Sequence, residues 1–340
     1  MGNAVIITAR MDSGRLPGKA IIEIGGIPNL LRIVKRLRNC KQVDVITVAT
    51  TERPIDDPIV ALCELDNIPV SRGETDDVIK RVYDAAKKLD AEYVLRATTD
   101  CSFISWELVD MAFSIVRIHQ TDSGRVWGYG GRFVPVYGSA EFPYSIGALE
   151  RLNRESVGIE REHPGMRLDV DRLSYNVVYP VPPARYYQTF SRGYRLELDT
   201  PEDLKLIRTI IDEMGDAPLH RIVRFLDARP DLAQINSGVN EKTGVLTSFS
   251  PEIRARWNQQ QALCSEEWIG DWSWLTSGSP ENLPKHAQAV YCEIGKDYLG
   301  YVLRGNDKVH RLHLLDGSIV TGRATIGCEC GGGREWYADK

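Results

Sequence analysis

The sequence lacks the features of several large classes of protein. None of its apolar runs approaches the length of a membrane span, and its N-terminus lacks the basic and apolar regions of a signal peptide. Its net charge of −5 gives no sign of a nucleic-acid partner. Its seven cysteines are an odd, scattered set in a chain long enough to fold without disulfides. We therefore expect a cytoplasmic protein that binds neither membranes nor nucleic acids.

Two general phosphate-binding fingerprints are also missing. The sequence contains neither G-x-x-x-x-G-K-[ST] nor G-x-G-x-x-G. Instead, a polar loop lies between an apolar run at residues 4–7 and a segment with apolar residues at helical spacing. Glycines let such a loop fold closely around anionic oxygens, and arginine and lysine supply donors that suit phosphate. The candidate phosphate ligands in this loop are Arg10, Ser13, Gly14, Arg15 and Lys19.

Strand and helix patterns alternate over the first half of the chain. Apolar runs of strand length occur at 4–7, 43–49, 68–70 and 93–97, with polar loops and helical periodicity between them. This alternation predicts an α/β fold with a mostly parallel sheet covered on both faces. Ligands of such sheets bind outside the carboxyl ends of the strands, so the loops that leave those ends are the candidate site.

Two aspartates follow predicted strands and would meet at that edge. Asp100 ends the fourth run, and Asp199 lies between an alternating stretch, 195–198, and the start of a helix. Thr200 supplies the cap of this helix, so Asp199 is available for another role. These two carboxylates are therefore candidate functional groups at that edge of the sheet.

The polar loop reads A-R-M-x-S-x-R-L-P-G-K over residues 9–19 and resembles the signature of cytidylyltransferases of the spore-coat polysaccharide type. Those proteins are related to enzymes that make CMP-linked sugar acids. The resemblance continues at 48–59 and 72–81 and in L-D-T-P-E-D-L over 198–204, so that it covers about residues 4–215. It implies a Rossmann-like nucleotide-diphospho-sugar transferase fold, and a homodimer that pairs through a segment near residues 125–160. The aromatic residues of that segment are Trp127, Tyr129, Phe133, Tyr137 and Phe142.

The resemblance also implies a reaction and a set of site residues. CMP would pass from CTP to a sugar acid, sugar phosphate or phosphonate, and pyrophosphate would leave. The implied catalytic residues are Arg15, Lys19, Asp100 and Asp199, of which the two aspartates bind Mg²⁺. The implied nucleotide-binding residues are Thr8, Ala9, Arg10, Ser13, Gly14, Ala49, Thr50, Arg72, Gly73 and Asp77. The implied contacts with the small anionic acceptor are Arg161 and His163.

The chain departs from the family pattern in two places. The family has roughly T-G-D-C-P, whereas this chain has Thr99 before Asp100 and Ser102 after the cysteine. The family's R-E-H is usually followed by Val-Thr, whereas His163 is followed here by Pro-Gly. Two other functions stay open: a glycosyltransferase that uses a nucleotide sugar, and a silent nucleotide-binding module. The first usually presents D-x-D at the metal, where this chain has Thr98-Thr-Asp100.

The C-terminal part follows a different pattern. We expect a cytidylyltransferase domain at 1–236, a linker and helix at 237–262, and a small β-rich domain of unknown role at 263–340. Short β runs at 289–294, 298–303, 309–314 and 318–321, separated by turn residues, predict an antiparallel meander. The cysteines of this region are either small apolar residues or ligands of a zinc site. Its candidate ligands are Cys264, Cys292, Cys328 and Cys330.

Overall fold

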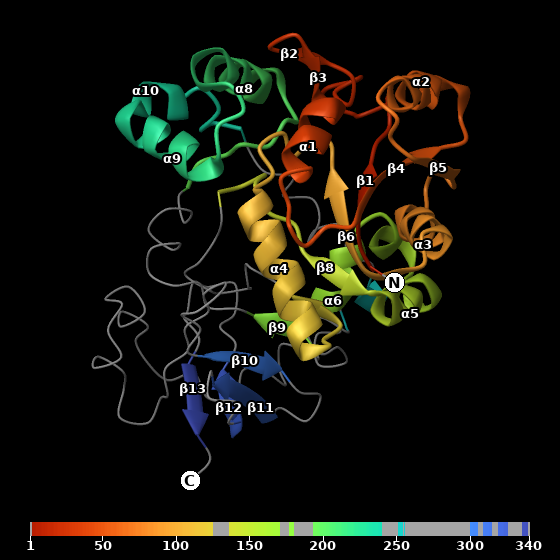
Figure 1. Cartoon of the computed structure of the whole chain (residues 1–340), viewed down its shortest axis with the longest axis vertical. Helices are drawn as coiled ribbons and strands as arrows, with labels where there is room; N and C mark the ends of the chain where they lie inside the picture. Colours follow the sequence, from red (N-terminus) through yellow and green to blue (C-terminus); the bar gives the residue numbers. More distant parts are fainter. Residues whose placement is uncertain are drawn as a thin grey trace.

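Four neighbouring parallel strands form one end of the sheet, as the alternating pattern predicts (Figure 1). In order across the sheet, they are β5 (Val70–Gly73), β4 (Val45–Thr51), β1 (Gly2–Thr8) and β6 (Ala91–Thr98). The carboxyl ends of these strands therefore lie along one edge. The computed structural model describes residues 2–124, 136–170, 177–179, 193–239, 251–253, 255, 300–304, 309–314, 319–325 and 335–338.

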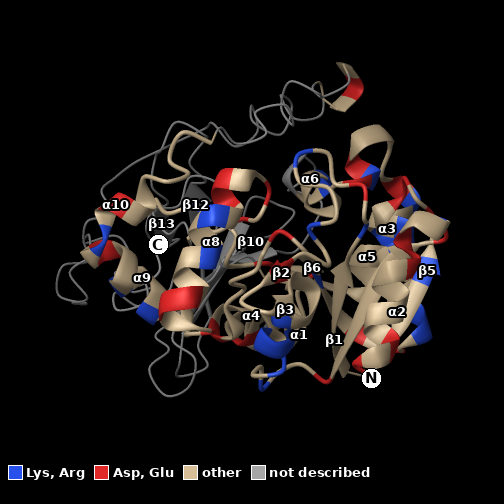
Figure 2. Ribbon diagram, turned by 90° about the horizontal axis from the view of Figure 1, so that it is seen from above, with Lys and Arg blue, Asp and Glu red and all other residues tan. Residues whose placement is uncertain are grey.

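Helices cover both faces of these strands and bury two apolar clusters against them. One face is covered by α3 (Val78–Lys88) and α5 (Ile146–Glu155). The other face is covered by α1 (Asn29–Leu37), α2 (Asp57–Leu65), α4 (Trp106–His119), α8 (Pro201–Met214) and α9 (Leu219–Ala228). The face of α1 that helical spacing predicts to be apolar is at most 1% exposed at Leu30, Ile33, Val34 and Leu37. Acidic and basic residues are interspersed along α3 and α8 (Figure 2), in keeping with the small net charge.

The sheet becomes mixed beyond β6. The next strand, β8 (Pro143–Ser145), pairs antiparallel with β6, and it is followed by β7 (Ser123–Gly124) and β9 (Val177–Tyr179). The C-terminal strands continue the same sheet, because β10 (Gly300–Arg304) pairs antiparallel with β9. They end with β11 (Val309–Leu314), β12 (Ile319–Thr325) and β13 (Glu335–Ala338).

This C-terminal arrangement agrees with the predicted antiparallel meander. The runs at 298–303, 309–314 and 318–321 correspond to β10, β11 and β12, which pair antiparallel with one another. The run at 289–294 lies outside the described residues. The remaining short elements are β2 (Glu23–Ile24), β3 (Ile27–Pro28), η1 (Pro54–Asp56), η2 (Gly158–Arg161), α6 (Pro164–Val170) and α10 (Pro230–Ala233).

The strand predicted at 195–198 is wrong in extent. This segment makes a single parallel bridge, between Tyr137 and Arg195. Beyond the bridge, the backbone N–H of Leu198 donates to the carbonyl of Asp100 at 2.8 Å. The segment is extended but does not form a longer strand, because it runs past the loop after β6 rather than along a neighbouring strand. It thereby delivers Asp199 beside Asp100.

No helix in the described part of the chain is long and apolar enough to cross a membrane.

Candidate active site

The four residues predicted to be catalytic meet at the carboxyl edge of the parallel strands. Lys19 Nζ lies 2.7 Å from Asp100 Oδ1 and 2.9 Å from Asp199 Oδ1. The second oxygen of Asp199 pairs with Arg15. Lys19 and Asp199 are only 6% and 3% exposed, so their charges are compensated mainly by one another. The spacing of the sequence motifs thus corresponds to one compact ionic cluster.

The loop that carries Lys19 is closed by its own backbone. The N–H of Gly18 donates to the carbonyl of Met11 at 2.7 Å, and the φ of Gly18 is +71°, a conformation that favours glycine. The N–H of Met11 in turn donates to the buried carboxylate of Asp56 at 2.7 Å. At Gly14, by contrast, an added Cβ would meet nothing within 4 Å. The expected conformational role of a glycine therefore belongs to Gly18.

A fully buried amide joins the Lys19 loop to the Asp100 loop. Asn29 Nδ2 donates to the carbonyls of Lys19 at 3.1 Å and Thr99 at 2.7 Å. Ser102, which replaces the family's proline, donates to Asn29 Oδ1 at 2.7 Å. Asn29 was not predicted as a site residue, because a polar residue at a helix start usually indicates a cap. Asn29 therefore fixes the distance between the Lys19 ammonium and the Asp100 carboxylate.

The start of α8 fixes the other carboxylate. The predicted capping box of Thr200 and Asp203 is present. Asp203 is fully buried and also accepts from the backbone N–H of Asp199 at 3.1 Å, from Arg195 Nε at 3.0 Å and from Asn236 Nδ2 at 2.8 Å. The capping residue therefore also sets the position of the candidate metal ligand.

Two further carboxyl groups, which the sequence motifs do not indicate, gather near Asp100. Burial raises the pKa of Glu197 to about 7, and the charge of Asp100 adds to this effect. Burial likewise raises the pKa of Glu141 to about 7, with Arg96 acting in the opposite direction. Cys101 Sγ donates to Glu141 Oε1 at 3.7 Å, and burial raises the pKa of this thiol. The field of these acids favours a cation at this edge.

The donor chemistry of the cluster fits Mg²⁺. Oxygens of Asp100 and Asp199 converge on one position, where the Lys19 ammonium now supplies the positive charge. No group of three or more His, Cys, Asp or Glu residues with metal-binding geometry occurs in the described part of the chain. Two carboxylates would suffice for Mg²⁺, because it usually keeps several waters and takes further ligands from substrate phosphates.

The predicted nucleotide-binding residues at the ends of β1 and β4 lie side by side. The N–H of Ala9 donates to the carbonyl of Ala49 at 3.2 Å. The hydroxyl of Thr8 faces the other way and donates to the carbonyl of Ala97 at 3.2 Å. Thr50 is fully buried, and its hydroxyl has no partner among the described residues. These positions offer mainly backbone groups at the strand ends.

The residues of the third motif make contacts that hold the surrounding loops. Arg72 donates to the carbonyls of Thr51 at 2.8 Å and Arg53 at 2.9 Å, beside Gly73 at the end of β5. Asp77 caps α3 and accepts from Arg161 Nε at 2.6 Å. The structure therefore pairs Asp77, which is predicted to bind the nucleotide, with Arg161, which is predicted to contact the acceptor. Their contacts with nucleotide or acceptor remain predictions.

Two remaining loop residues lie further from the ionic cluster. Arg10 Nη2 approaches Glu162 Oε1 at 3.4 Å, which links the phosphate-binding loop to the segment that holds the half-buried His163. Ser13 is 9% exposed. The acceptor contact predicted for His163 remains a prediction.

Several predicted features lie outside the described residues. They include the four candidate zinc ligands, Cys264, Cys292, Cys328 and Cys330, and the aromatic residues Trp127, Tyr129 and Phe133. The cysteines that the structure describes, Cys40, Cys63 and Cys101, are free thiols.

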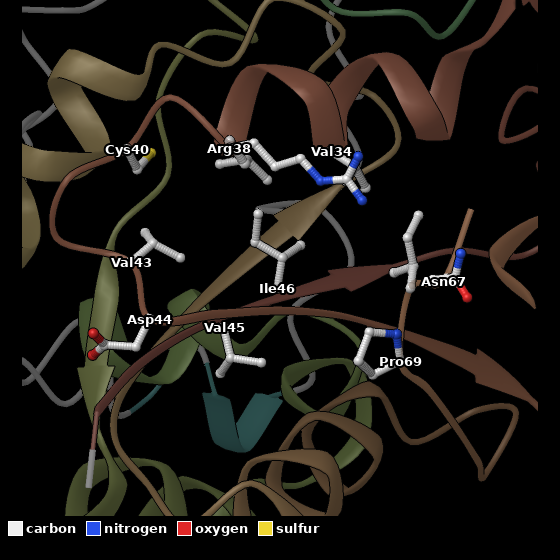
Figure 3. A pocket seen from close by; sticks show the side chains of 11 residues that line it. Val34, Arg38, Cys40, Val43, Asp44, Val45, Ile46, Asn67 and Pro69 are labelled. Carbon is white, nitrogen blue, oxygen red and sulfur yellow. The ribbon is translucent and has the colours of Figure 1, made fainter.

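A pocket of about 350 Å³ lies at the opposite, amino-terminal edge of the sheet (Figure 3). Its lining comes from the end of α1 and the segments that enter β4 and β5, including Cys40, Val45, Ile46 and Pro69. Because this pocket is remote from the strand ends that carry Asp100 and the Lys19 loop, it is not part of the candidate site.

Known proteins resemble this chain in sequence and in fold. The cytidylyltransferase family model matches residues 4–214. An uncharacterized protein of Methanocaldococcus jannaschii is 30% identical over 241 residues, which are 70% of this chain and 96% of that protein. The spore coat polysaccharide biosynthesis protein SpsF of Bacillus subtilis is 29% identical over 243 residues, 67% of this chain and 95% of that protein. The structure of a cytidylyltransferase from Leptospira borgpetersenii shares the fold, with a TM-score of 0.62 and 24% identity over 71% of this chain and all of that one. The chain therefore belongs to the cytidylyltransferase family.

Proposed function

We propose that the protein transfers CMP from CTP to a small anionic acceptor, a sugar acid, sugar phosphate or phosphonate, with release of pyrophosphate. The observation that carries the proposal is the meeting of Lys19 and Arg15 with Asp100 and Asp199 at the carboxyl edge of the sheet. Cations next to paired carboxylates suit a nucleoside triphosphate and a divalent metal together.

In this reaction the chain positions charge and forms no covalent bond. The Lys19 loop binds the β and γ phosphates, so that Lys19 and Arg15 exchange their carboxylate partners for phosphate oxygens. Mg²⁺, held by Asp100 and Asp199, would neutralise charge on the phosphates. An acceptor oxygen forms a bond to the α-phosphorus, and the bond from that phosphorus to the pyrophosphate oxygen breaks. Arg15 and Lys19 stabilise the charge that collects on pyrophosphate.

Two alternatives make different predictions. A glycosyltransferase would release a nucleotide from a nucleotide sugar and would leave CTP intact. A silent nucleotide-binding module would bind CTP without turnover, but the charged set of Arg15, Lys19, Asp100 and Asp199 would then have no chemical use. Family membership and the ionic cluster both favour the transferase.

The test is pyrophosphate release from CTP and Mg²⁺ with a panel of sugar acids, sugar phosphates and phosphonates. Asp100→Asn and Asp199→Asn should each lower the rate by a factor of about 100 or more, because each removes a charge that holds the metal. Asp84→Asn is the matched control, since Asp84 forms only an exposed pair with Lys80 on α3. Near-normal release by either active-site variant would exclude the assigned roles.

We also propose that the protein is a cytoplasmic homodimer. The dimer is proposed from the predicted interface aromatic residues of the 125–160 segment, of which Tyr137 and Phe142 are described; their rings contact Arg195 and Tyr144 of the same chain. A single species with the mass of one chain in light scattering at micromolar concentration would reject the dimer.

A further inference from the structure

The side chain of Arg96 has no hydrogen-bond or ion-pair partner among the residues that the structure describes. It lies in β6, four residues before Asp100, and is half-buried. In the described part of the chain it makes no hydrogen bond or ion pair, and its Nε is buried without an acceptor. Of the five N–H donors of this guanidinium group, the one on Nε is both buried and unsatisfied, which is unfavourable. The fold alone therefore does not explain this residue.

The surroundings of Arg96 make this arrangement still less favourable. Arg81 of α3 is only 3% exposed, and its Nε also lacks an acceptor, although its Nη1 donates to the carbonyl of Thr75 at 3.2 Å. Burial first, then the charges of Arg96 and Arg10, lower the pKa of Arg81 to about 10. Arg96 and Arg10 are thus each close enough to repel Arg81, although Asp56 and Asp77 act in the opposite direction. A site that accumulates like charge attracts an ion of opposite charge.

The nearest acid on the other side does not neutralise Arg96. Glu141, which precedes β8, attracts Arg96 but makes no ion pair with it. Its carboxyl oxygen accepts from Cys101 Sγ. Because burial holds the pKa of Glu141 near 7, this group carries only part of its charge at neutral pH. Glu141 therefore offsets the charge of Arg96 only in part.

Arg96 is separate from the Lys19 loop. Successive residues of a strand point to opposite faces, and Leu95 and Ala97 pack in the cluster that also receives Leu16 and Ala20 of the loop. Val94 packs in the cluster beneath α3 and α5, so Arg96 belongs to that second face. Of the predicted nucleotide residues, those of β4 and β5 lie on one side of β1, whereas Arg96 lies on β6 next to β8, on the other side; Thr8 and the loop after it lie between them, at the end of β1.

We propose that Arg96 binds the anionic group of the acceptor, a carboxylate, phosphate or phosphonate, in a subsite distinct from the triphosphate-binding loop. That the bound anion belongs to the acceptor rests on the proposed function. Arg81 and Arg10 reinforce the positive field, and Arg96 supplies the forked donors that match two oxygens of one anion. The anion would stand on the β8 side of Asp100, opposite the nucleotide.

The experiment is a calorimetric titration of inorganic phosphate into the full-length protein saturated with CTP and Mg²⁺. CTP fills the Lys19 loop, so phosphate reports on the remaining anion site. Arg96→Gln should weaken phosphate binding at least about tenfold, and Arg96→Lys should weaken it less, because lysine keeps the charge but not the fork. Arg154→Ala is the control, since Arg154 is 66% exposed and pairs only with Glu155. It should bind phosphate as the unaltered protein does.

A second titration separates the two sources of the anion. CTP affinity in the absence of phosphate should be the same, within a factor of about two, for Arg96→Gln and the unaltered protein. An equal loss for CTP would assign Arg96 to the nucleotide phosphates and overturn the acceptor subsite. No phosphate binding by the CTP-saturated protein, or undiminished binding by Arg96→Gln, would also overturn it.

Stability and nucleotide binding provide the remaining controls. The unfolding temperature of ligand-free Arg96→Gln should not fall, because the substitution removes repulsion from Arg81; a clear fall would indicate a structural role and overturn the proposal. If the unaltered protein binds no CTP, the proposed function fails. Phosphate binding that depends on Arg96 in a Lys19→Ala background would still support the anion site.

Discussion

Lys19 has two roles in this account, as a counter-ion of carboxylates and as a ligand of phosphate. Its ammonium group now compensates two carboxylates, Asp100 and Asp199, at 2.7 and 2.9 Å. In the proposed reaction it moves to the β and γ phosphates. The lysine therefore compensates the two carboxylates within the fold, and in the proposed complex Mg²⁺ would take over that role while the lysine pairs with phosphate.

Lys19→Ala tests both roles. CTP affinity should fall about tenfold or more, whereas CMP affinity should change little, because CMP lacks the phosphates assigned to Lys19. Without nucleotide, Mg²⁺ should raise the unfolding temperature of the variant more than that of the unaltered protein, since the metal replaces the missing positive charge. Calorimetry and thermal unfolding measure the two effects.

Lys205→Ala is the matched control for this test, because Lys205 is exposed on α8. Equal losses for CTP and CMP in Lys19→Ala would contradict the phosphate role. An equal Mg²⁺ effect in both proteins would contradict the role as a counter-ion.

At the scale of elements, the helix start of α8 controls the active site. Asp203 caps the helix and holds the backbone of Asp199 at 3.1 Å. Asp203→Ala should lower the free energy of unfolding by about 1–3 kcal/mol, because it removes the cap and leaves buried donors unsatisfied. It should also weaken Mg²⁺-dependent CTP binding, although Asp203 contacts neither ligand in the proposed complex.

Glu202→Ala provides the comparison for Asp203, since Glu202 is exposed in the same helical turn. Its effect on denaturant unfolding and on CTP titration should be small. If Asp203→Ala lowered stability but left metal and nucleotide binding unchanged, the cap would support the helix without positioning Asp199.

The parallel strands and their loops could be predicted because the signals are local. Strands β1, β4 and β6 are nearly continuous apolar runs, and each is followed by a polar loop. The partners that orient the site could not be predicted in the same way. Asn29 joins Lys19 to Thr99, which lies 70 positions further along the chain, and Asn236 reaches Asp203 across 33. A short sequence motif cannot indicate contacts between residues that are so far apart in the chain.

The short strands in the mixed part of the sheet were not predicted from the sequence, for a related reason. Strands β7 and β9 have only two and three residues, too few for an alternating pattern to stand out. The alternating segment at 195–198, in contrast, has the pattern of a strand but only one bridging partner, Tyr137. A strand needs a neighbour, and sequence periodicity alone does not show one.

At the scale of the whole molecule, the predicted boundary near residue 236 can be tested. The Methanocaldococcus jannaschii relative is matched over 96% of its length by 70% of this chain, so the remaining part of the chain has no counterpart in it. The ionic cluster lies entirely before residue 200. Asn236, however, bonds Asp203 at 2.8 Å and must be kept.

A fragment of residues 1–239 should therefore fold and bind CTP and Mg²⁺ with affinity within a factor of about three of the full chain. It retains Asn236 and every residue of the ionic cluster, while β9 becomes an edge strand through loss of β10. Circular dichroism and calorimetry provide the comparison. Aggregation of the fragment, or loss of nucleotide binding, would show that the C-terminal strands belong to the same folding unit.

The most direct measurement of the central claim is a calorimetric comparison of CTP, UTP, ATP and GTP binding to the full-length protein with Mg²⁺. The account predicts that CTP binds at least about tenfold more tightly than the other three. It also predicts that Asp199→Asn removes the dependence of CTP binding on Mg²⁺. Absence of CTP binding, equal binding of all four nucleotides, or Mg²⁺ dependence that survives in Asp199→Asn would contradict it.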